Sequence, residues 1–224
     1  MSSKTTRSAP GSTDPFAHVP EFALRLFRTE PVASTVRRWH ELRIPGPFQS
    51  PELIVAAHRA RDAMAPLPFT EEEALAQRDE RREALLSPHL SSCHVVLYEE
   101  ALHRVAACLG PDVASAQARF LTEVVDRRAT WCDARTSVAI LPRASRLLFA
   151  PGDLTMLTFA PDASEQDFIY SEYEFGIAGG VDANYVTDPA LLASANETWK
   201  RLTGYSLDPD STRELLTRLP GSTG

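Results

Sequence analysis

The stretch CHVVLYEEALHR at residues 93–104 contains the change of pattern on which the fold assignment depends. The run VVLY, which ends at Tyr98, is short, apolar and β-forming, so it predicts a strand. From Glu99 onward the apolar residues of ALHRVAACL recur at helical spacing. We therefore expect a buried strand that leads directly into a helix, with an acidic residue at the junction.

Glu99 is the first candidate functional residue. A carboxylate at the end of a buried strand has apolar neighbours, which raise its pKa and allow proton exchange near neutral pH. His89 and His94 lie ten and five residues before it. The alternative interpretation is structural, because an acidic residue in the first turn of a helix is stabilised by the helix dipole.

Length and composition fit one sizeable hydrophobic core. The chain has 224 residues, 43% of them hydrophobic, and a net charge of −7. Its Arg residues alternate with Glu and Asp, so there is no basic face and we expect no nucleic-acid partner. Three cysteines without closely spaced pairs indicate a cytoplasmic protein. No apolar run approaches the length of a transmembrane helix, so we expect no membrane partner.

The N-terminal third is expected to be helical. Residues 1–20 are rich in Ser, Thr and Pro and predict a disordered leader, followed by a single domain over residues 21–220. Apolar residues at helical spacing predict a helix that begins at Glu21 and includes Trp39. The IPGP run at 44–47 ends it, because proline interrupts a helix.

Two more helices are predicted from their N-terminal caps. Ser50 is followed by Pro51 at the first helical position, and a capping box begins at Thr70. The second of these helices carries Arg78 and Arg82 four residues apart on one face. The ordinary interpretation of such arginines is a solvated, ion-paired helix face.

The second half of the chain is expected to contain a helix, then three strands, then two helices. The pattern indicates a helix at 112–128, strands at 136–141, 153–159 and 168–173 with a hairpin loop at 162–166, and helices at 188–202 and 208–216. The residues 176–180 are expected to form a loop. The whole predicts an α+β single domain with a helical N-terminal third and a small, mostly antiparallel sheet flanked by helices.

Glu172, in the aromatic run YSEYE, is a second acidic candidate. If the hairpin strands pack beside the central strand, Glu172 and Glu99 approach each other. Aromatic residues such as Phe48, Tyr98 and Tyr170 are more often core than pocket. Aromatic rings beside carboxylates nevertheless suit a planar, cationic amine.

A metal site is not expected. His89, His94, His103 and Cys93 are close in sequence, but alternate residues of a strand point to opposite faces. Their spacing also matches no common set of metal ligands.

Several motifs, taken in order, resemble a bacterial domain family of long-unknown function. That domain commonly follows an XRE-type helix-turn-helix in antitoxin-like regulators. The corresponding stretches are IPGPFQSPE at 44–52, RDER at 78–81, LYEEAL at 97–102, ILP at 140–142 and YSE at 170–172. The resemblance covers about residues 20–218. Since the leader stands where those regulators carry the helix-turn-helix, it implies a ligand- or partner-binding regulator without its own DNA contact.

The central stretch is also similar to bacterial Pictet–Spenglerases of the marinacarboline and streptonigrin type. These enzymes condense tryptophan-like amines with aldehydes to give β-carbolines. In that group an acidic base follows a histidine and, further upstream, an arginine; Glu99, His89 and either Arg78 or Arg82 have this order. The similarity implies a cofactor-free cyclase that acts on tryptophan or a derivative, with an indole amine and an aldehyde as partners.

The chemistry of ring closure assigns the implied roles. Glu99 would stabilise the cationic intermediate and take its proton, and His89 would orient Glu99 or relay that proton. An arginine would hold the substrate carboxylate. The further substrate contacts would be Phe48, Tyr98, Tyr170 and Glu172.

The resemblance also implies a homodimer. The apolar N-terminal helix around Phe22, Leu26 and Phe27 has no obvious partner in the chain and is the expected contact.

Overall fold

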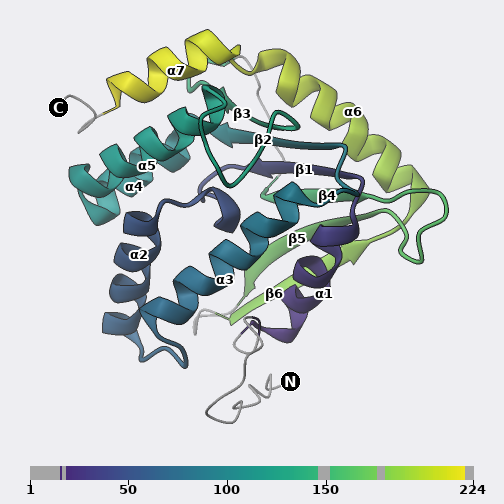
Figure 1. Ribbon diagram of the computed structural model, residues 1–224, viewed down its shortest axis with the longest axis horizontal. Helices are drawn as coiled ribbons and strands as arrows, with labels where there is room; N and C mark the ends of the chain where they lie inside the picture. Colours follow the sequence, from purple (N-terminus) through teal and green to yellow (C-terminus); the bar gives the residue numbers. More distant parts are fainter. Residues whose placement is uncertain (1–15, 17–18, 146–151, 176–179, 220–224) are drawn as a thin grey trace.

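A computed structural model describes residues 16, 19–145, 152–175 and 180–219 (Figure 1). The predicted disordered leader at 1–20 lies almost entirely outside these residues. Within them, six strands form a single sheet: β1 (Thr35–His40), β2 (Ser92–Tyr98), β3 (Thr136–Leu141), β4 (Leu154–Thr158), β5 (Phe168–Phe175) and β6 (Gly180–Val186). The α-helices are α1 (Glu21–Thr29), α2 (Pro51–Met64), α3 (Glu71–Glu83), α4 (Glu99–Leu109), α5 (Pro111–Val125), α6 (Pro189–Tyr205) and α7 (Pro209–Arg218).

The sheet is mixed and has the strand order β3-β2-β1-β4-β5-β6. The strands β1, β2 and β3 are parallel, and β4, β5 and β6 extend the sheet from β1 with antiparallel pairings. The connections between the parallel strands run through α2 and α3 and through α4 and α5. Three of the five strand pairings are thus antiparallel, and the predicted α+β fold is confirmed.

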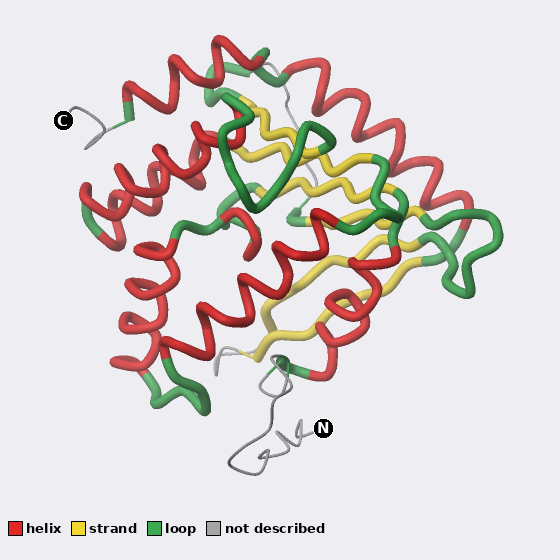
Figure 2. Tube along the Cα trace, in the orientation of Figure 1, coloured by secondary structure: helices red, strands yellow, loops and turns green. Residues whose placement is uncertain are grey.

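Helices cover both faces of this sheet (Figures 1 and 2). On one face the larger core contains Val36 of β1, Val95 of β2 and Leu121 of α5. On the opposite face, α6 packs Trp199 and other apolar side chains against Trp39 of β1. Because alternate strand residues point to opposite faces, β1 and β2 each contribute apolar side chains to both cores: Val36 and Val95 to one, Trp39 and Val96 to the other.

The predicted strand-to-helix junction is confirmed. Strand β2 ends at Tyr98 and α4 begins at Glu99, without an intervening loop. The predicted caps are also present: the Ser50 side chain accepts a hydrogen bond from the Leu53 N–H, and Thr70 begins a complete capping box. Local sequence chemistry therefore determines where these helices begin.

The predicted helix from Glu21 through Trp39 is wrong. Helix α1 ends at Thr29, a short 3₁₀ turn containing Pro31 follows, and residues 35–40 form β1. Val36 and Trp39 lie on opposite faces of a buried strand, so both are apolar although they are three residues apart. A spacing of three residues between apolar side chains is also typical of a helix, which explains the wrong prediction.

Strand β6 was also missed. It begins at Gly180, at the end of the predicted loop, and pairs with β5 along its whole length. Residues 176–179 of that loop lie outside the described residues. The sheet therefore has six strands where the sequence predicted four.

The apolar face of α1 packs inside the chain. Leu26 and Phe27 belong to the core, and the Tyr185 hydroxyl of β6 donates a hydrogen bond of 2.7 Å to the Phe22 carbonyl. Helix α1 therefore does not offer the free apolar surface that was expected as a dimer contact. The homodimer itself stays a prediction.

A buried charged cluster joins the segment after α1, strand β1 and helix α3. Glu30 follows α1 and is 3% exposed; its carboxylate accepts hydrogen bonds of 2.6 Å from Arg38 of β1 and of 2.6 and 2.8 Å from Arg81 of α3. Arg38 and Arg81 are equally buried, at 2% and 6% exposed. Burial by itself would raise the pKa of Glu30, but the two guanidinium groups outweigh this effect and hold the pKa below its ordinary value.

We expect Glu30→Gln to lower the free energy of unfolding by about 3–5 kcal/mol, because it leaves two buried arginines without a counter-charge. Urea denaturation at pH 7 measures the loss. Glu165→Gln is the matched control, since Glu165 pairs with Arg25 at 3.4 Å near the surface. That change should cost less than about 1 kcal/mol.

The same cluster predicts the direction of a pH effect. The stability contributed by ionised Glu30 is fully present above the ordinary glutamate pKa and is lost as the pH falls through the lower pKa of the folded state. The stability difference between the wild type and Glu30→Gln should therefore shrink in acid. A loss as small as that of Glu165→Gln would contradict the role given to Glu30.

Candidate functional site

A small hollow of about 30 Å³ lies on the face of the sheet that carries the larger core, where β1 ends and β4 begins. Side chains from β1, the segment after it, β4, β5 and the residue before β4 line it: His40, Arg43, Asp153, Leu154, Thr155, Tyr170 and Glu172. The hollow is thus at the carboxyl end of the parallel strand β1. In open sheets with parallel strands, ligands commonly bind at this end of the strands.

Strand register explains why these residues meet. Thr155 of β4 pairs with Arg38 on one side and with Tyr170 of β5 on the other. Because side chains alternate, Arg38 and His40 share one face of β1, and Tyr170 and Glu172 share the same face of β5. The hydroxyl oxygen of Thr155 accepts a 3.4 Å hydrogen bond from Arg38, so the buried Glu30 cluster directly supports the hollow.

Asp153 is the anchor of the charged residues in the hollow. Its carboxylate accepts a hydrogen bond of 2.7 Å from the Glu41 backbone N–H and one of 3.0 Å from Nε of Arg43, and it lies 3.3 Å from Nδ1 of His40. Burial would raise the pKa of Asp153, but these partners together hold the pKa well below its ordinary range. Asp153 is therefore a fixed negative charge.

His40 is a neutral group at the bottom of the hollow. Burial lowers its pKa, Asp153 partly opposes that effect, and Arg38 and Arg43 add to it. Neither ring nitrogen makes a well-directed hydrogen bond to any described residue. Nδ1 faces the Asp153 carboxylate, so Nε2 is the nitrogen that retains hydrogen-bonding capacity inside the site.

Tyr170 and Glu172 form the other wall. The Tyr170 hydroxyl donates a hydrogen bond of 2.7 Å to one oxygen of Glu172, and Nη1 of Arg43 donates one of 3.0 Å to the other. Burial, followed by the charge of Glu172, raises the pKa of Tyr170 well above its ordinary value. Arg43 and Glu172 are 46% and 28% exposed, so the hollow opens to solvent on this side.

Arg82, one of the two predicted substrate arginines, has a structural role. Its guanidinium donates to the backbone carbonyl oxygens of Pro47 (3.0 Å) and Gln49, and it forms an ion pair of 2.6 Å with Asp79. It also stacks on the ring of Phe120. Arg82 thus fixes the segment at 44–49 against α3, and its donors are occupied.

Arg78, the other predicted arginine, faces the same segment but has no such set of partners. It donates to the side-chain oxygens of Gln49, at 3.2 Å, and of Gln77. Burial and the neighbouring guanidinium groups of Arg81 and Arg82 lower its pKa to about 10. Arg78 is not among the residues that line the hollow.

The remaining predicted residues lie elsewhere. Phe48 is fully buried in the core beside Trp131, with ring centroids 5.5 Å apart. Tyr98 packs near Trp39 on the opposite face of the sheet. Of the predicted substrate contacts, Tyr170 and Glu172 line the hollow.

Glu99 is held at the start of α4. Its carboxylate accepts a 2.7 Å hydrogen bond from the backbone N–H of Arg143 and lies 3.2 Å from Nε2 of His103. His89 is exposed and precedes β2, so it lies at the other end of a seven-residue strand, about 20 Å away. The structure does not bring His89 to Glu99.

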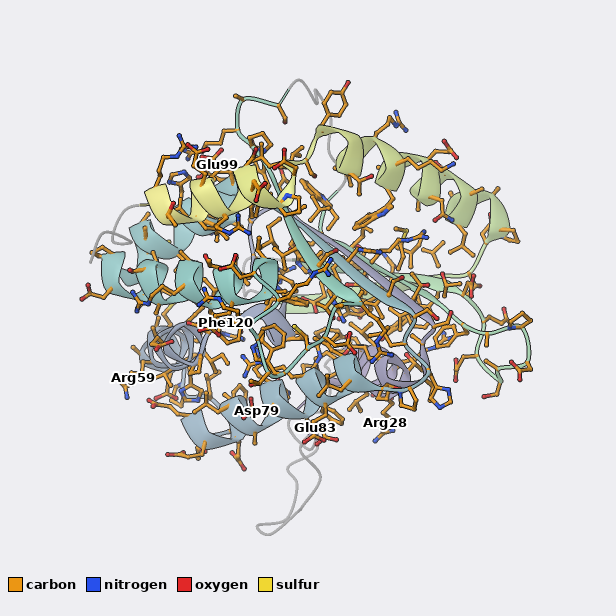
Figure 3. All side chains as sticks on the ribbon, turned by 45° about the horizontal axis from the view of Figure 1, so that its top comes forward. Arg28, Arg59, Asp79, Glu83, Glu99 and Phe120 are labelled. Carbon is orange, nitrogen blue, oxygen red and sulfur yellow. The ribbon has the colours of Figure 1, made fainter. Side chains whose placement is uncertain are left out.

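The expected approach of Glu99 to Glu172 is wrong. Strands β1 and β4 lie between β2 and β5, so three strand spacings, about 14 Å, separate the positions that carry them. Figure 3 shows Glu99 on the side of α4 and α7, well apart from Asp79 and Glu83 of α3. By this strand order, the two candidate acids Glu99 and Glu172 lie in separate parts of the molecule.

Sequence reasoning missed five residues of the hollow: His40, Arg43, Asp153, Leu154 and Thr155. Two of them, His40 and Arg43, lie at the end of β1 or shortly after it, and β1 was predicted to be helical. The available signal was β-branched composition at residues 35–36, directly after the turn at Pro31. A correct strand there would have placed His40 beside the predicted strand that begins at Asp153.

The chain belongs to the family described as "Domain of unknown function (DUF5753)", whose model matches residues 24–218. No curated protein and no solved structure matches it. Among the described residues, no helix has the length and apolar character needed to cross a membrane. Nor is any group of three His, Cys, Asp or Glu side chains in the described part placed to hold a metal ion.

We expect His40 to titrate below the ordinary histidine pKa of about 6.5. Between that value and the lower folded-state pKa, the unfolded chain binds the proton and the folded chain does not, so stability falls as the pH falls. NMR titration of the His40 ring measures the pKa.

Asp153→Asn should lower the pKa of His40 further, because it removes the neighbouring negative charge. His40→Gln should flatten the pH dependence of stability in the same window. A His40 pKa at or above 6.5 would show that the ring is not desolvated as the structure has it.

Proposed function

We propose that this chain is a ligand-binding domain that holds a small polar molecule in the hollow and serves a regulatory role. The observation that carries the proposal is the convergence of Arg43, Asp153, Tyr170 and Glu172 around one solvent-reaching hollow. These groups come from segments far apart in the sequence. Two of them, Asp153 and Tyr170, have strongly shifted pKa values, and such groups are found at functional sites more often than elsewhere.

The hollow offers both kinds of hydrogen-bonding group. Arg43 is a cationic donor, Asp153 and Glu172 are anionic acceptors, and Tyr170 is a neutral hydroxyl. The exposed fraction of Arg43, 46%, lets this side chain move toward an incoming molecule. A polar ligand can then take over contacts that the residues now make with one another.

The resemblance of the sequence motifs supports a regulatory role. They resemble a domain that commonly follows an XRE-type helix-turn-helix, and in such regulators DNA contact would be made by that other domain. Ligand or partner binding is then the role that this domain contributes. The net charge of −7 also argues against nucleic acid as a partner.

We expect a thermal-shift screen with amino acids, organic acids, aromatic amines and nucleosides to yield a stabilising compound. A ligand at 100 times its Kd raises Tm by about 5–10 °C in a chain of this size. Tyr170→Phe and Glu172→Gln should each remove most of the shift.

Tyr205→Phe is the matched control, because Tyr205 is exposed on α6, away from the hollow. The control should keep the full shift. A stabilising compound whose effect survives both hollow variants would refute binding at this place.

A second candidate function is the cofactor-free Pictet–Spengler cyclase on tryptophan or a derivative. The observation that favours it is the Glu99–His103 pair at 3.2 Å, a carboxylate beside an imidazole at the solvent-reaching end of β2. In this scheme Glu99 is the base, and His103 takes the positioning role that His89 is too distant to play. The homodimer belongs to the same proposal.

For the cyclase we expect Glu99→Gln to reduce tetrahydro-β-carboline formation from tryptophan and an aldehyde by about 100- to 10,000-fold, the usual cost of losing a general base. Mass spectrometry of the product measures the rate. Glu100→Gln is the matched control, because among the described residues the partner of the Glu100 carboxylate is the Arg143 guanidinium. Wild-type protein without turnover above the uncatalysed rate would eliminate the cyclase.

A further inference from the structure

We propose that the chain has a second binding site, for a phosphate group, on the face of the sheet that α6 covers (Figure 1). It consists of Arg37 of β1, His94 of β2 and Ser137 of β3. The hollow lies on the opposite face, so this site is separate from it and does not depend on the function proposed there.

Strand register places the three side chains in one row. Arg37 pairs with His94, and His94 pairs with Ser137. Residues paired across neighbouring strands point to the same face of a sheet, and the strands are about 4.8 Å apart. Three polar side chains, one of them cationic, therefore stand side by side on the parallel part of the sheet.

Arg37 is a cation without a counter-charge. It belongs to an interior strand that carries two consecutive arginines. Arg38, on the other face, is neutralised by Glu30 at 2.6 Å. Arg37 instead donates to the side-chain oxygen of Asn196 in α6, and no carboxylate of a described residue lies within ion-pair distance of it. An amide oxygen accepts a hydrogen bond but does not neutralise a guanidinium group.

Helix α6 supplies a fixed but neutral acceptor. The Asn196 amide nitrogen donates a hydrogen bond of 3.0 Å to the Leu192 carbonyl, which orients the amide oxygen toward Arg37. The acidic residue beside it in the sequence, Glu197, pairs with Lys200 at 2.7 Å. The charge of Arg37 is therefore available to a ligand.

His94 and Ser137 form the exposed half of the row. Both residues are exposed, and Nδ1 of His94 lies 2.7 Å from Oγ of Ser137. This contact holds the imidazole ring in one orientation. The other ring nitrogen, Nε2, has no hydrogen-bond partner among the described residues, so it can bind an incoming group.

The adjacent row of the same face carries hydroxyl groups. Thr35 pairs with Ser92 on one side and with Thr158 on the other, and all three residues are partly buried. None of them brings a negative charge that would repel an anion.

A phosphate group fits these donors better than a carboxylate does. It has more acceptor oxygens and a larger negative charge, so it can accept from a guanidinium group, an imidazole and a hydroxyl at once. The same chemistry is offered by inorganic phosphate and by a phosphate ester, and the two sources can be distinguished by experiment.

The ionisation of His94 gives a readout of binding. Burial, and after it the charge of Arg37 on β1, lowers the pKa of His94. Ser137, its neighbour on β3, carries no charge. A bound phosphate would favour the protonated ring, so binding at this place should raise the His94 pKa.

The test uses sodium phosphate and phenyl phosphate as separate probes, with sodium chloride keeping the ionic strength constant. NMR follows the ring signals of His94, which His94→Asn assigns. We expect a saturable shift at pH 7 with at least one probe, and a higher His94 pKa when that probe is bound. A response to both probes means that the phosphate group is sufficient, and a response to phenyl phosphate alone means that the ligand is an ester.

Two variants and one control make the result specific. Arg37→Gln should weaken binding about tenfold or more, because it removes the cation. Asn196→Asp should weaken it as much, because the new carboxylate neutralises Arg37, and its unchanged or higher Tm would show that the fold is kept. Arg201→Gln removes an exposed positive charge from the same helix, where the described partner is Thr198, and should bind as the wild type does.

No saturable change of the His94 signals with either probe would overturn the proposal. Wild-type binding by Arg37→Gln and Asn196→Asp would also overturn it, as would an equal weakening by Arg201→Gln, which would indicate a general attraction by positive charge. None of these outcomes bears on ligand binding in the hollow, which Tyr170→Phe tests.

Discussion

The buried carboxylate of Glu30, held between Arg38 and Arg81, is the interaction on which the rest of the structure depends. Removing three charges from water is expensive, and the cluster is stable only because each group is hydrogen-bonded as well as paired. Its geometry joins the segment after α1, the central strand β1 and helix α3. These directional bonds fix one position of α3 against β1 and the segment after α1.

That fixed position of α3 determines the polar side of the molecule. Arg78 and Arg82 lie on the same helix as Arg81, so they are carried to the segment at 44–49 once Arg81 is docked on Glu30. Arg38 in turn reaches Thr155, which lines the hollow. A stabilising cluster and a candidate binding site are therefore adjacent parts of one hydrogen-bonded network.

The parts of this fold that could be predicted are those determined by neighbours in sequence. The β2–α4 junction and the caps at Ser50 and Thr70 need only local chemistry, and the sequence contains it. Strand β1 was mistaken for a helix, because Val36 and Trp39 are buried on opposite faces and their spacing of three residues outweighed the weaker β-branched signal at residues 35–36. Because β1 was missed, His40 was not recognised as a site residue, and neither was the pairing of β1 with β4 that brings Asp153 to it. The site could not be assembled from the sequence, since its residues meet only through strand register.

Three glutamates show why residue type alone does not identify a site. Glu30 is enclosed by two guanidinium groups and serves stability; Glu99 lies in the first turn of α4 and accepts a backbone N–H from Arg143; Glu172 shares its oxygens between a tyrosine and an exposed arginine. Only the last has partners that an incoming molecule can replace at little cost, because Arg43 can turn toward solvent and remain hydrated. The capacity to exchange partners, which depends on burial and on the mobility of the counter-charge, is what separates a binding carboxylate from a structural one.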